Sequence, residues 1–259
     1  MKILIVGDPH AADGYDNDRF SWLGHFVADE QPDTIVCMGD FADMKSLSSY
    51  DKGRRSAEGK RYNEDIAAVV DAQDKMFSPI DAMNTRRREA KKAQYKPRKI
   101  MCIGNHEQRI ERATQADPSL HGTISYDDLK YSDYGWEVHD YQVPVIVAGI
   151  AFCHNFPTGV SGNPVSGENI ARALLSKNFM SSVVGHIHTL DRAKRSRPDR
   201  ATLFGLSAGC YVHYDFVEGW NRATERMWYR GVVVLDGVSQ GYFQHYREVS
   251  MKTLEEKYG

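Results

Sequence analysis

Five short apolar runs in this 259-residue chain are each followed by glycine, aspartate or histidine. The stretch Ile100–Arg109, which reads Ile-Met-Cys-Ile-Gly-Asn-His-Glu-Gln-Arg, shows the pattern most fully. Its apolar part predicts a buried strand, and Asn105, His106 and Arg109 follow that strand. Because ligands of α/β proteins bind at the carboxyl ends of strands, we expect these three side chains to lie in a functional site.

The other four runs end in the same way. They are Lys2–Val6, Thr34–Met38, Gly149–Phe152 and Ser181–Val184. The polar residues that follow them are Asp8 and His10, Asp40, His154, and His186 with His188. Any one of these short motifs is weak alone, since isolated aspartates and histidines are usually structural. Five of them at strand ends predict one site that is assembled from the whole chain.

The order of the elements predicts an α/β fold. A helix is expected over Asp18–Glu30, where apolar residues recur at helical spacing between the first two strands. A strand, a helix and a second strand form a βαβ unit, in which the strands are parallel and the crossover is right-handed. From Trp136 the apolar pattern changes to a period of two, which predicts several further strands.

Residues 44–98 separate the second strand from the third and carry many basic side chains. We expect a polar loop, a helix through Phe77, and a second helix beginning at Ser78-Pro79, where serine would cap and proline would take the first position. We interpret this region as a basic helical insert. Near the carboxyl end, the runs Met227–Leu235 and Gly241–Arg247 predict a hairpin, and the charged tail from Ser250 is expected to fray.

Composition limits the class of protein. A hydrophobic fraction of 41% is ordinary for a globular chain with a real core, and a net charge of −2 gives no general affinity for polyanions. The four cysteines form no CxxC pair and lie in apolar runs, so we expect buried thiols and a cytoplasmic protein. The first apolar run is too short for a signal peptide, and no run reaches the ~20 residues that cross a bilayer. We found no repeat or linker, and therefore expect one domain over 1–259.

The strand-end groups have the chemistry of a metal site. They are Asp8, His10, Asp40, Asn105, His154, His186 and His188. Carboxylate, amide and imidazole ligands without thiolate suit Mn²⁺, Fe²⁺, Zn²⁺ or Ni²⁺, of which we favour Mn²⁺. Seven ligands are too many for one tetrahedral ion but suit two ions ~3.5–4 Å apart, an arrangement that clamps a phosphoryl group and activates water.

These motifs together resemble the calcineurin-like metallophosphoesterase family. The resemblance rests on Asp8-x-His10, Gly39-Asp40-x-x-Asp43, Gly104-Asn105-His106-Glu107, His154 and Gly185-His186-x-His188. It implies a four-layer α/β/β/α sandwich that binds two divalent ions. The first ion would be held by Asp8, His10, Asp40 and His188, and the second by Asp40, Asn105, His154 and His186, with Asp40 bridging. One departure is Asn155, which stands where the family often has glycine.

The resemblance also implies a reaction. A metal-bound hydroxide would attack phosphorus, while His106 would protonate the leaving oxygen. Asp40 and His106 would then be the catalytic residues, and Asn105 and Arg109 would contact the phosphate. A bidentate guanidinium fits that role, although a salt bridge from Arg109 to Glu107 or Asp43 is an equal alternative.

The substrate is less constrained than the reaction. Basic groups in 54–61, 86–99 and 192–200 favour a nucleotide or nucleic-acid phosphate ester, either a monoester or a diester. The basic part of the insert is either a solvated helical face or a flap over the site. A DNA exonuclease or endonuclease is one alternative, and a metal-binding scaffold without turnover is another. Neither a membrane nor an obligate protein partner is expected.

Overall fold

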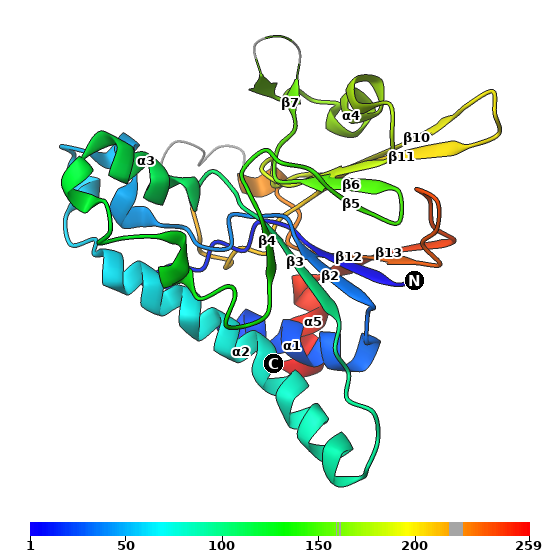
Figure 1. Ribbon diagram of the computed structural model, residues 1–259, viewed down its shortest axis with the longest axis horizontal. Helices are drawn as coiled ribbons and strands as arrows, with labels where there is room; N and C mark the ends of the chain where they lie inside the picture. The colour runs from blue at the N-terminus through cyan, green and yellow to red at the C-terminus, as the bar shows by residue number, and fades with distance from the viewer. Residues whose placement is uncertain (159, 161, 218–224) are drawn as a thin grey trace.

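The computed structural model describes residues 1–158, 160, 162–217 and 225–259, which form a mixed α/β fold of two facing sheets (Figure 1). The first sheet contains, in spatial order, β13 (His245–Ser250), β12 (Gly231–Asp236), β1 (Ile3–Val6), β2 (Thr34–Cys37), β3 (Arg98–Cys102) and β4 (Glu137–His139). The second contains β10 (Leu190–Ser196), β11 (Thr202–Ala208), β9 (Ser182–Val184), β6 (Ile150–Cys153) and β5 (Val145–Val147). A short separate pair is formed by β7 (Pro157–Thr158) and β8 (Asn163–Pro164).

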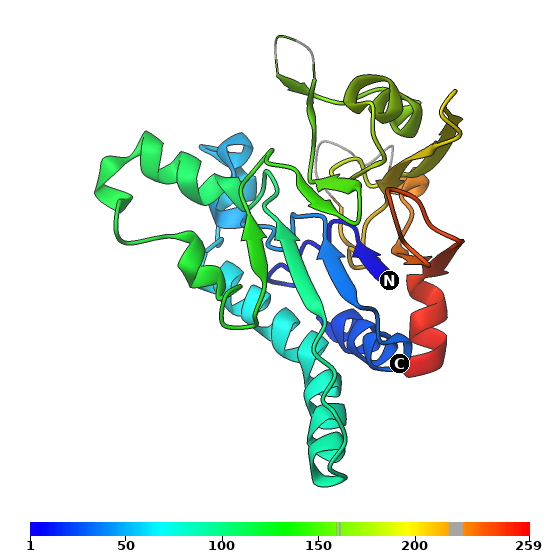
Figure 2. The same ribbon diagram turned by 45° about the vertical axis from the view of Figure 1, so that its right-hand side comes forward.

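The described α-helices surround the two sheets. They are α1 (Asp18–Glu30), α2 (Tyr62–Glu89), α3 (Gln108–Ala116), α4 (Ile170–Asn178) and α5 (Met251–Tyr258). Short 3₁₀ turns are η1 (Lys45–Leu47), η2 (Ser49–Asp51), η3 (Arg55–Ala57), η4 (Pro118–Leu120), η5 (Tyr126–Leu129) and η6 (Glu225–Met227). In Figures 1 and 2, α1, α2 and α5 cover the first sheet, whereas α4 lies beside the second. None of the described helices combines the length and apolar character that a membrane span requires.

Alternation along the strands explains why both sheet faces are covered. Ile3 and Ile5 of β1 belong to an apolar cluster shared with Phe152 and Leu206 of the second sheet. Leu4 and the other alternate side chains of β1 belong instead to the cluster that includes α1, α2 and α5. A fully buried side chain of this size stabilises the fold by about 1.5–3 kcal/mol, so both faces of β1 contribute.

Strand direction brings the polar loops together. Strands β1 to β4 are parallel to one another, and β6, β9 and β11 are parallel in the second sheet. The strands that precede the five sequence motifs therefore all end at the same edge of the two sheets. A backbone hydrogen bond of 2.8 Å from His10 N–H to the Asp40 carbonyl continues the pairing of β1 with β2 into the loops. The predicted strand ends are confirmed.

The prediction of two helices in 44–98 is wrong. One continuous helix, α2, runs from Tyr62 to Glu89 and contains Pro79. Pro79 is buried, and a Cβ atom added to Gly24 of α1 would lie 3.0 Å from its ring and 2.2 Å from the Met76 carbonyl oxygen. Close packing of α2 on α1 thus holds the helix together across a proline that costs about 3 kcal/mol in a free helix.

The tail from Ser250 does not fray, contrary to expectation. The Ser250 hydroxyl accepts a hydrogen bond from Thr253 N–H and caps α5, which is a regular helix. Met251 and Leu254 are buried in the cluster shared with α1. The predicted carboxyl-terminal hairpin is present as β12 and β13, but β12 also pairs with β1 and so completes the first sheet.

Candidate metal centre

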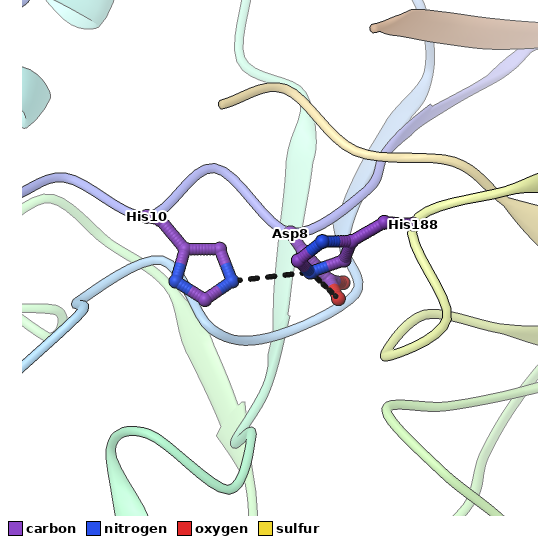
Figure 3. A group of neighbouring side chains, drawn as sticks. All are labelled: Asp8, His10 and His188. Atoms are coloured by element: carbon purple, nitrogen blue, oxygen red, sulfur yellow. Dashed lines mark hydrogen bonds and ion pairs between the residues drawn. The ribbon is translucent and has the colours of Figure 1, made fainter. Parts of the chain in front are cut away.

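Three side chains form a first group of potential ligands at the edge where the sheets meet. Asp8, His10 and His188 present ligand atoms within 4.8 Å of one another, as Figure 3 shows. Nε2 of His188 lies 3.2 Å from Asp8 Oδ2 and 3.2 Å from His10 Nε2. These atoms therefore converge on a common point, although they come from loops that are 178 residues apart in the chain.

The Asp8 carboxylate is the strongest sign that this group holds a cation. Asp8 is completely buried, and neither of its oxygens has a hydrogen-bond partner in the described part of the chain. The contact with His188 is close but lacks hydrogen-bond geometry. A buried carboxylate that receives no hydrogen bond is costly, and its neighbours are the imidazoles of His188 at 3.2 Å and His154 at 3.9 Å, so a divalent cation is the natural partner for both oxygens. Oxygen and imidazole donors also fit the metals favoured from the sequence.

A second group contains Asp40, His154 and His186, again with ligand atoms within 4.8 Å of one another. Nε2 of His154 lies 3.3 Å from Asp40 Oδ2 and 3.0 Å from the Asn105 amide oxygen. The other ring nitrogen, Nδ1, is 2.8 Å from the Met38 carbonyl oxygen, which fixes the orientation of the ring. The structure thus brings Asn105 to this group, as the sequence predicts.

Asp40 stands between the two groups. Its Oδ2 atom is 3.3 Å from His154 in the second group and 3.9 Å from Nε2 of His10 in the first. Its Oδ1 atom accepts a hydrogen bond of 2.8 Å from His106 N–H, which leaves Oδ2 directed between the groups. One carboxylate therefore faces both sets of imidazoles.

The loops that carry the ligands have strained backbones. His10, Asp40, His186 and His188 all have positive φ angles, between 45° and 67°. Residues other than glycine rarely adopt this region, and each such residue costs about 1–3 kcal/mol. Strain at four potential ligands in one cluster indicates that the loops are shaped to present these side chains.

Glycine precedes several ligands because neighbouring loops approach closely. A Cβ atom on Gly104 would lie 2.1 Å from Asp40 Oδ1, and one on Gly185 would lie 2.5 Å from Asp8 Oδ1. Any larger residue would displace a carboxylate from the site. The recurrent glycine at strand ends in the sequence thus has a steric cause.

Glu107 holds the loops after β2 and β3 together, a role that sequence analysis missed. Its fully buried carboxylate accepts hydrogen bonds of 2.9–3.0 Å from the backbone N–H groups of Asp40, Ala42 and Gly104. The Tyr131 hydroxyl donates a fourth hydrogen bond at 3.0 Å, so this buried tyrosine also supports the loops. Burial and the charge of Asp40 raise the pKa of Glu107.

Arg19 of α1 supports the first loop from beneath. This buried arginine donates to the carbonyl oxygens of Pro9 at 3.1 Å and Tyr211 at 3.0 Å. Burial lowers its pKa to about 10. In the sequence Arg19 is one charged residue in an amphipathic helix, and only the folded loop gives it a distinct role.

His106 is held beside Asp40 by Asp43 and Arg109. Nδ1 of His106 lies 2.9 Å from Asp43 Oδ1, and the same oxygen is 2.7 Å from Nδ1 of His10. Nε2 of His106 is 4.0 Å from Asp40 Oδ2 and 3.2 Å from Nη2 of Arg109. One carboxylate, Asp43, therefore orients both His106 and a potential metal ligand.

Arg109 forms neither of the salt bridges considered from the sequence. Its Nη1 atom donates to the carbonyl oxygens of Asp43 at 2.7 Å and Met44 at 3.4 Å. Backbone carbonyls orient the guanidinium without neutralising its charge. Helix α3 begins at Gln108, because Asn105, His106 and Glu107 form the turn that carries the site.

Asn155, the departure from the family pattern, does not displace His154. Its amide donates to the Tyr141 hydroxyl at 2.9 Å and its side-chain oxygen accepts from Gln142 at 3.0 Å. The side chain is buried in this network, and His154 keeps its position beside Asp40.

The two histidines of the second group differ in pKa. Burial favours a neutral His154, but the charges of Asp40, Asp8 and Glu107 outweigh it and raise its pKa to about 9. Burial and the charge of His154 lower the pKa of His186 to about 4. Burial would also raise the pKa of Asp40, yet His154 and His106 hold it well below the ordinary value. Without metal, a charged His154 therefore neutralises Asp40.

Two of the three basic segments lie away from this centre. Arg88, Lys96 and Lys99 line a cavity of about 620 Å³ near the start of β3, whereas Asn105 and His106 follow the end of that strand. Arg192 and Arg195 belong to β10, an edge strand that pairs with β11. The basic end of α2 is thus not a flap over the site. Only the segment around Arg54 borders His106 and Arg109.

Comparison with known proteins decides the family. The model of the calcineurin-like phosphoesterase family matches residues 1–190, which include every potential ligand described above. This chain belongs to the calcineurin-like phosphoesterase family. Members are generally metal-dependent phosphoesterases that bind divalent ions, and the two groups around Asp40 could hold such ions.

The other comparisons add little. A search of curated proteins finds no significant match. One crystal structure aligns over 96% of this chain and 98% of its own, with 12% identity and a TM-score of 0.38. A likeness of that size supports no conclusion about function.

Metal binding should release a proton from His154. Its pKa of about 9 means that the ring is protonated at neutral pH, and a metal ion must displace that proton from Nε2. We expect affinity for Mn²⁺ to rise with pH and to level off above about pH 9. Calorimetry in buffers of different ionisation enthalpy should detect about one proton released at neutral pH. If Mn²⁺ binding released no proton, or if the affinity for Mn²⁺ did not depend on pH, His154 would not be the protonated ligand. The control is His245→Ala, which replaces an exposed histidine.

Proposed function

We propose that this protein hydrolyses a phosphate ester at two divalent metal ions that share Asp40. The observation that carries the proposal is the position of Asp40 Oδ2, which faces His10 on one side and His154 on the other. The first ion would be held by Asp8, His10, Asp40 and His188. The second would be held by Asp40, Asn105, His154 and His186. Mn²⁺ is the favoured metal, and Fe²⁺, Zn²⁺ and Ni²⁺ have the same ligand preferences.

Bound divalent ions would lower the pKa of a water molecule and neutralise phosphate oxygens. The protein's own residues account for the other requirements. Hydrolysis forms a bond from water oxygen to phosphorus and breaks the bond from phosphorus to the alcohol oxygen, which must receive a proton. His106, which contacts Asp43 and lies 4.0 Å from Asp40 Oδ2, would supply that proton. Asp40 and His106 are thus the proposed catalytic residues.

Arg109 and Asn105 are the proposed phosphate contacts. The guanidinium of Arg109 is fixed by two backbone carbonyls and lies 3.2 Å from His106, so its positive charge is close to where the leaving oxygen would be protonated. Fixed donors near developing negative charge stabilise a transition state more than a ground state. The amide of Asn105 sits within the second group and can address the same phosphate.

We further propose that 1–259 is one domain with a four-layer α/β/β/α arrangement. The apolar cluster between the sheets and the clusters beneath the helices support it. In this proposal the two parts of the basic segment 44–98 have different roles. Its first part borders the site, while α2 contributes Val69 and Met76 to the core, as the crossover between β2 and β3.

Reconstitution with Mn²⁺ tests the proposed activity. We expect the protein to hydrolyse bis-p-nitrophenyl phosphate, p-nitrophenyl phosphate or both, and Asp40→Asn to lose this turnover, because a neutral amide weakens both metal groups. Turnover of the diester would favour a nuclease or cyclic-nucleotide substrate, and turnover of the monoester alone a phosphatase. No turnover on either ester with any of the four metals would favour a metal-binding scaffold. Retained turnover in Asp40→Asn would contradict the shared carboxylate.

Replacement of His106 tests the proposed acid. We expect His106→Ala to reduce kcat by about 10²–10⁴-fold on an alkyl phosphate ester while metal content stays unchanged. The loss should be much smaller for p-nitrophenyl esters, since p-nitrophenolate leaves without protonation. Metal analysis of the purified variant separates lost acid from lost metal, and His245→Ala provides an exposed histidine as control. Equal losses on both kinds of ester would remove His106 from the role of acid.

A further inference from the structure

A pocket of about 480 Å³ opens beside His106 and Arg109. We call it the leaving-group pocket, because His106 is the proposed acid and the departing alcohol must lie on its side. Its other walls include Tyr15, Lys45, Arg54 and Phe216. The volume is within the range of small-molecule sites, about 300–1,000 Å³.

Positive charge is concentrated in this pocket although the whole chain has a net charge of −2. Four cations and two carboxylates line it. Both carboxylates are already engaged, since Asp43 bonds His10 and His106 while Asp51 pairs with Lys60 at 2.6 Å. The remaining cations thus present charge that the pocket itself does not neutralise.

Lys45 is the most informative of these cations. Its ammonium lies 4.3 Å from the centre of the Tyr15 ring and 5.8 Å from that of Phe216. The ammonium donates a hydrogen bond to the Asp13 carbonyl oxygen at 3.2 Å. Among the described residues, no carboxylate oxygen lies within 4.0 Å of Lys45 Nζ, the limit for an ion pair. Burial lowers its pKa despite the nearby charge of Asp43. A partly buried ammonium without an ion-pair partner is costly, so an anionic ligand would stabilise it.

Aromatic faces continue from the metal centre into the pocket. The Phe216 ring lies 5.0 Å from that of His10 and 5.6 Å from that of Tyr15. Tyr50 adds a largely exposed ring to the pocket wall. The Phe216 ring is buried, whereas the exposed face of Tyr50 can stack on a base with little dependence on sequence. The pocket therefore combines one exposed aromatic ring with several positive charges.

Resting on the proposed function, we propose that the leaving-group pocket binds a second phosphate carried by the departing alcohol. The substrate class would be a nucleotide-type ester in which the leaving nucleoside itself bears another phosphate. For a bisphosphate, water would add to one phosphorus, the phosphorus–alcohol oxygen bond would break, and inorganic phosphate and a nucleoside monophosphate would form. A mononucleotide with two phosphates and a single nucleic-acid strand share this chemistry.

The test compares adenosine 3′,5′-bisphosphate with adenosine 5′-monophosphate and 3′-monophosphate on the Mn²⁺-loaded protein. We expect kcat/KM for the bisphosphate to exceed that for either monophosphate by about tenfold, the scale of one charge-assisted hydrogen bond. Lys45→Met, which keeps the aliphatic stem over Tyr15, should remove most of this preference, and Lys45→Arg should restore it. Lys52→Met removes an exposed lysine from the same segment and should leave the preference unchanged.

The inference would be overturned if wild-type kcat/KM were about the same for the bisphosphate and the monophosphates. It would also be overturned if Lys45→Met lowered kcat/KM equally for all three nucleotides. Hydrolysis of p-nitrophenyl esters, whose leaving group carries no phosphate, reports the proposed function separately. If no ester is hydrolysed, calorimetric affinities for the same three nucleotides test the pocket, and equal affinities reject it.

A tetrathymidylate strand distinguishes the two sources of the second phosphate. Cleavage or binding of the strand that depends on Lys45 would assign a nucleic-acid strand. If only cleavage or binding of the bisphosphate depended on Lys45, the second phosphate would belong to a mononucleotide substrate.

Discussion

The concentration of buried carboxylates at one sheet edge is the constraint on which the rest of this structure depends. Asp8, Asp40, Asp43 and Glu107 are all buried there. Removing a carboxylate from water costs several kcal/mol unless it is paired or hydrogen-bonded. Asp43 is satisfied by two histidines and Glu107 by backbone N–H groups, whereas the oxygens of Asp8 lie near two imidazoles but receive no hydrogen bond from the described chain. The arrangement therefore makes physical sense around cations.

Much of the surrounding structure can be understood as support for that cluster. Glycine at 104 and 185 leaves room for the oxygens of Asp40 and Asp8. Glu107 ties the loops after β2 and β3 to each other, and Arg19 fixes the loop after β1. The strained backbone of the ligand residues persists because these contacts over-determine it. These contacts thus hold together loops that lie far apart in the sequence.

The sequence was sufficient to predict the five strands that precede the motifs and the residues that meet at their ends, because hydrophobic periodicity and strand-end chemistry are local signals. It was insufficient wherever tertiary contacts override local preference. Pro79 resembles a helix start, but packing on Gly24 carries α2 through it. The tail from Ser250 is charged, yet Leu254 buries against α1. The roles of Glu107 and Arg19 depend on distant backbone groups that no spacing encodes. The expected buried thiols are confirmed, whereas the cytoplasmic location remains a prediction.

The central claim is that Asp40 is shared by two metal ions. Anomalous scattering from crystals loaded with Mn²⁺ tests it most directly, because each bound ion gives a separate peak whether or not a substrate is known. The account predicts two peaks, one beside Asp8, His10 and His188 and the other beside His154 and His186, with the Asp40 carboxylate between them. A single peak, or a second peak away from Asp40, would contradict it.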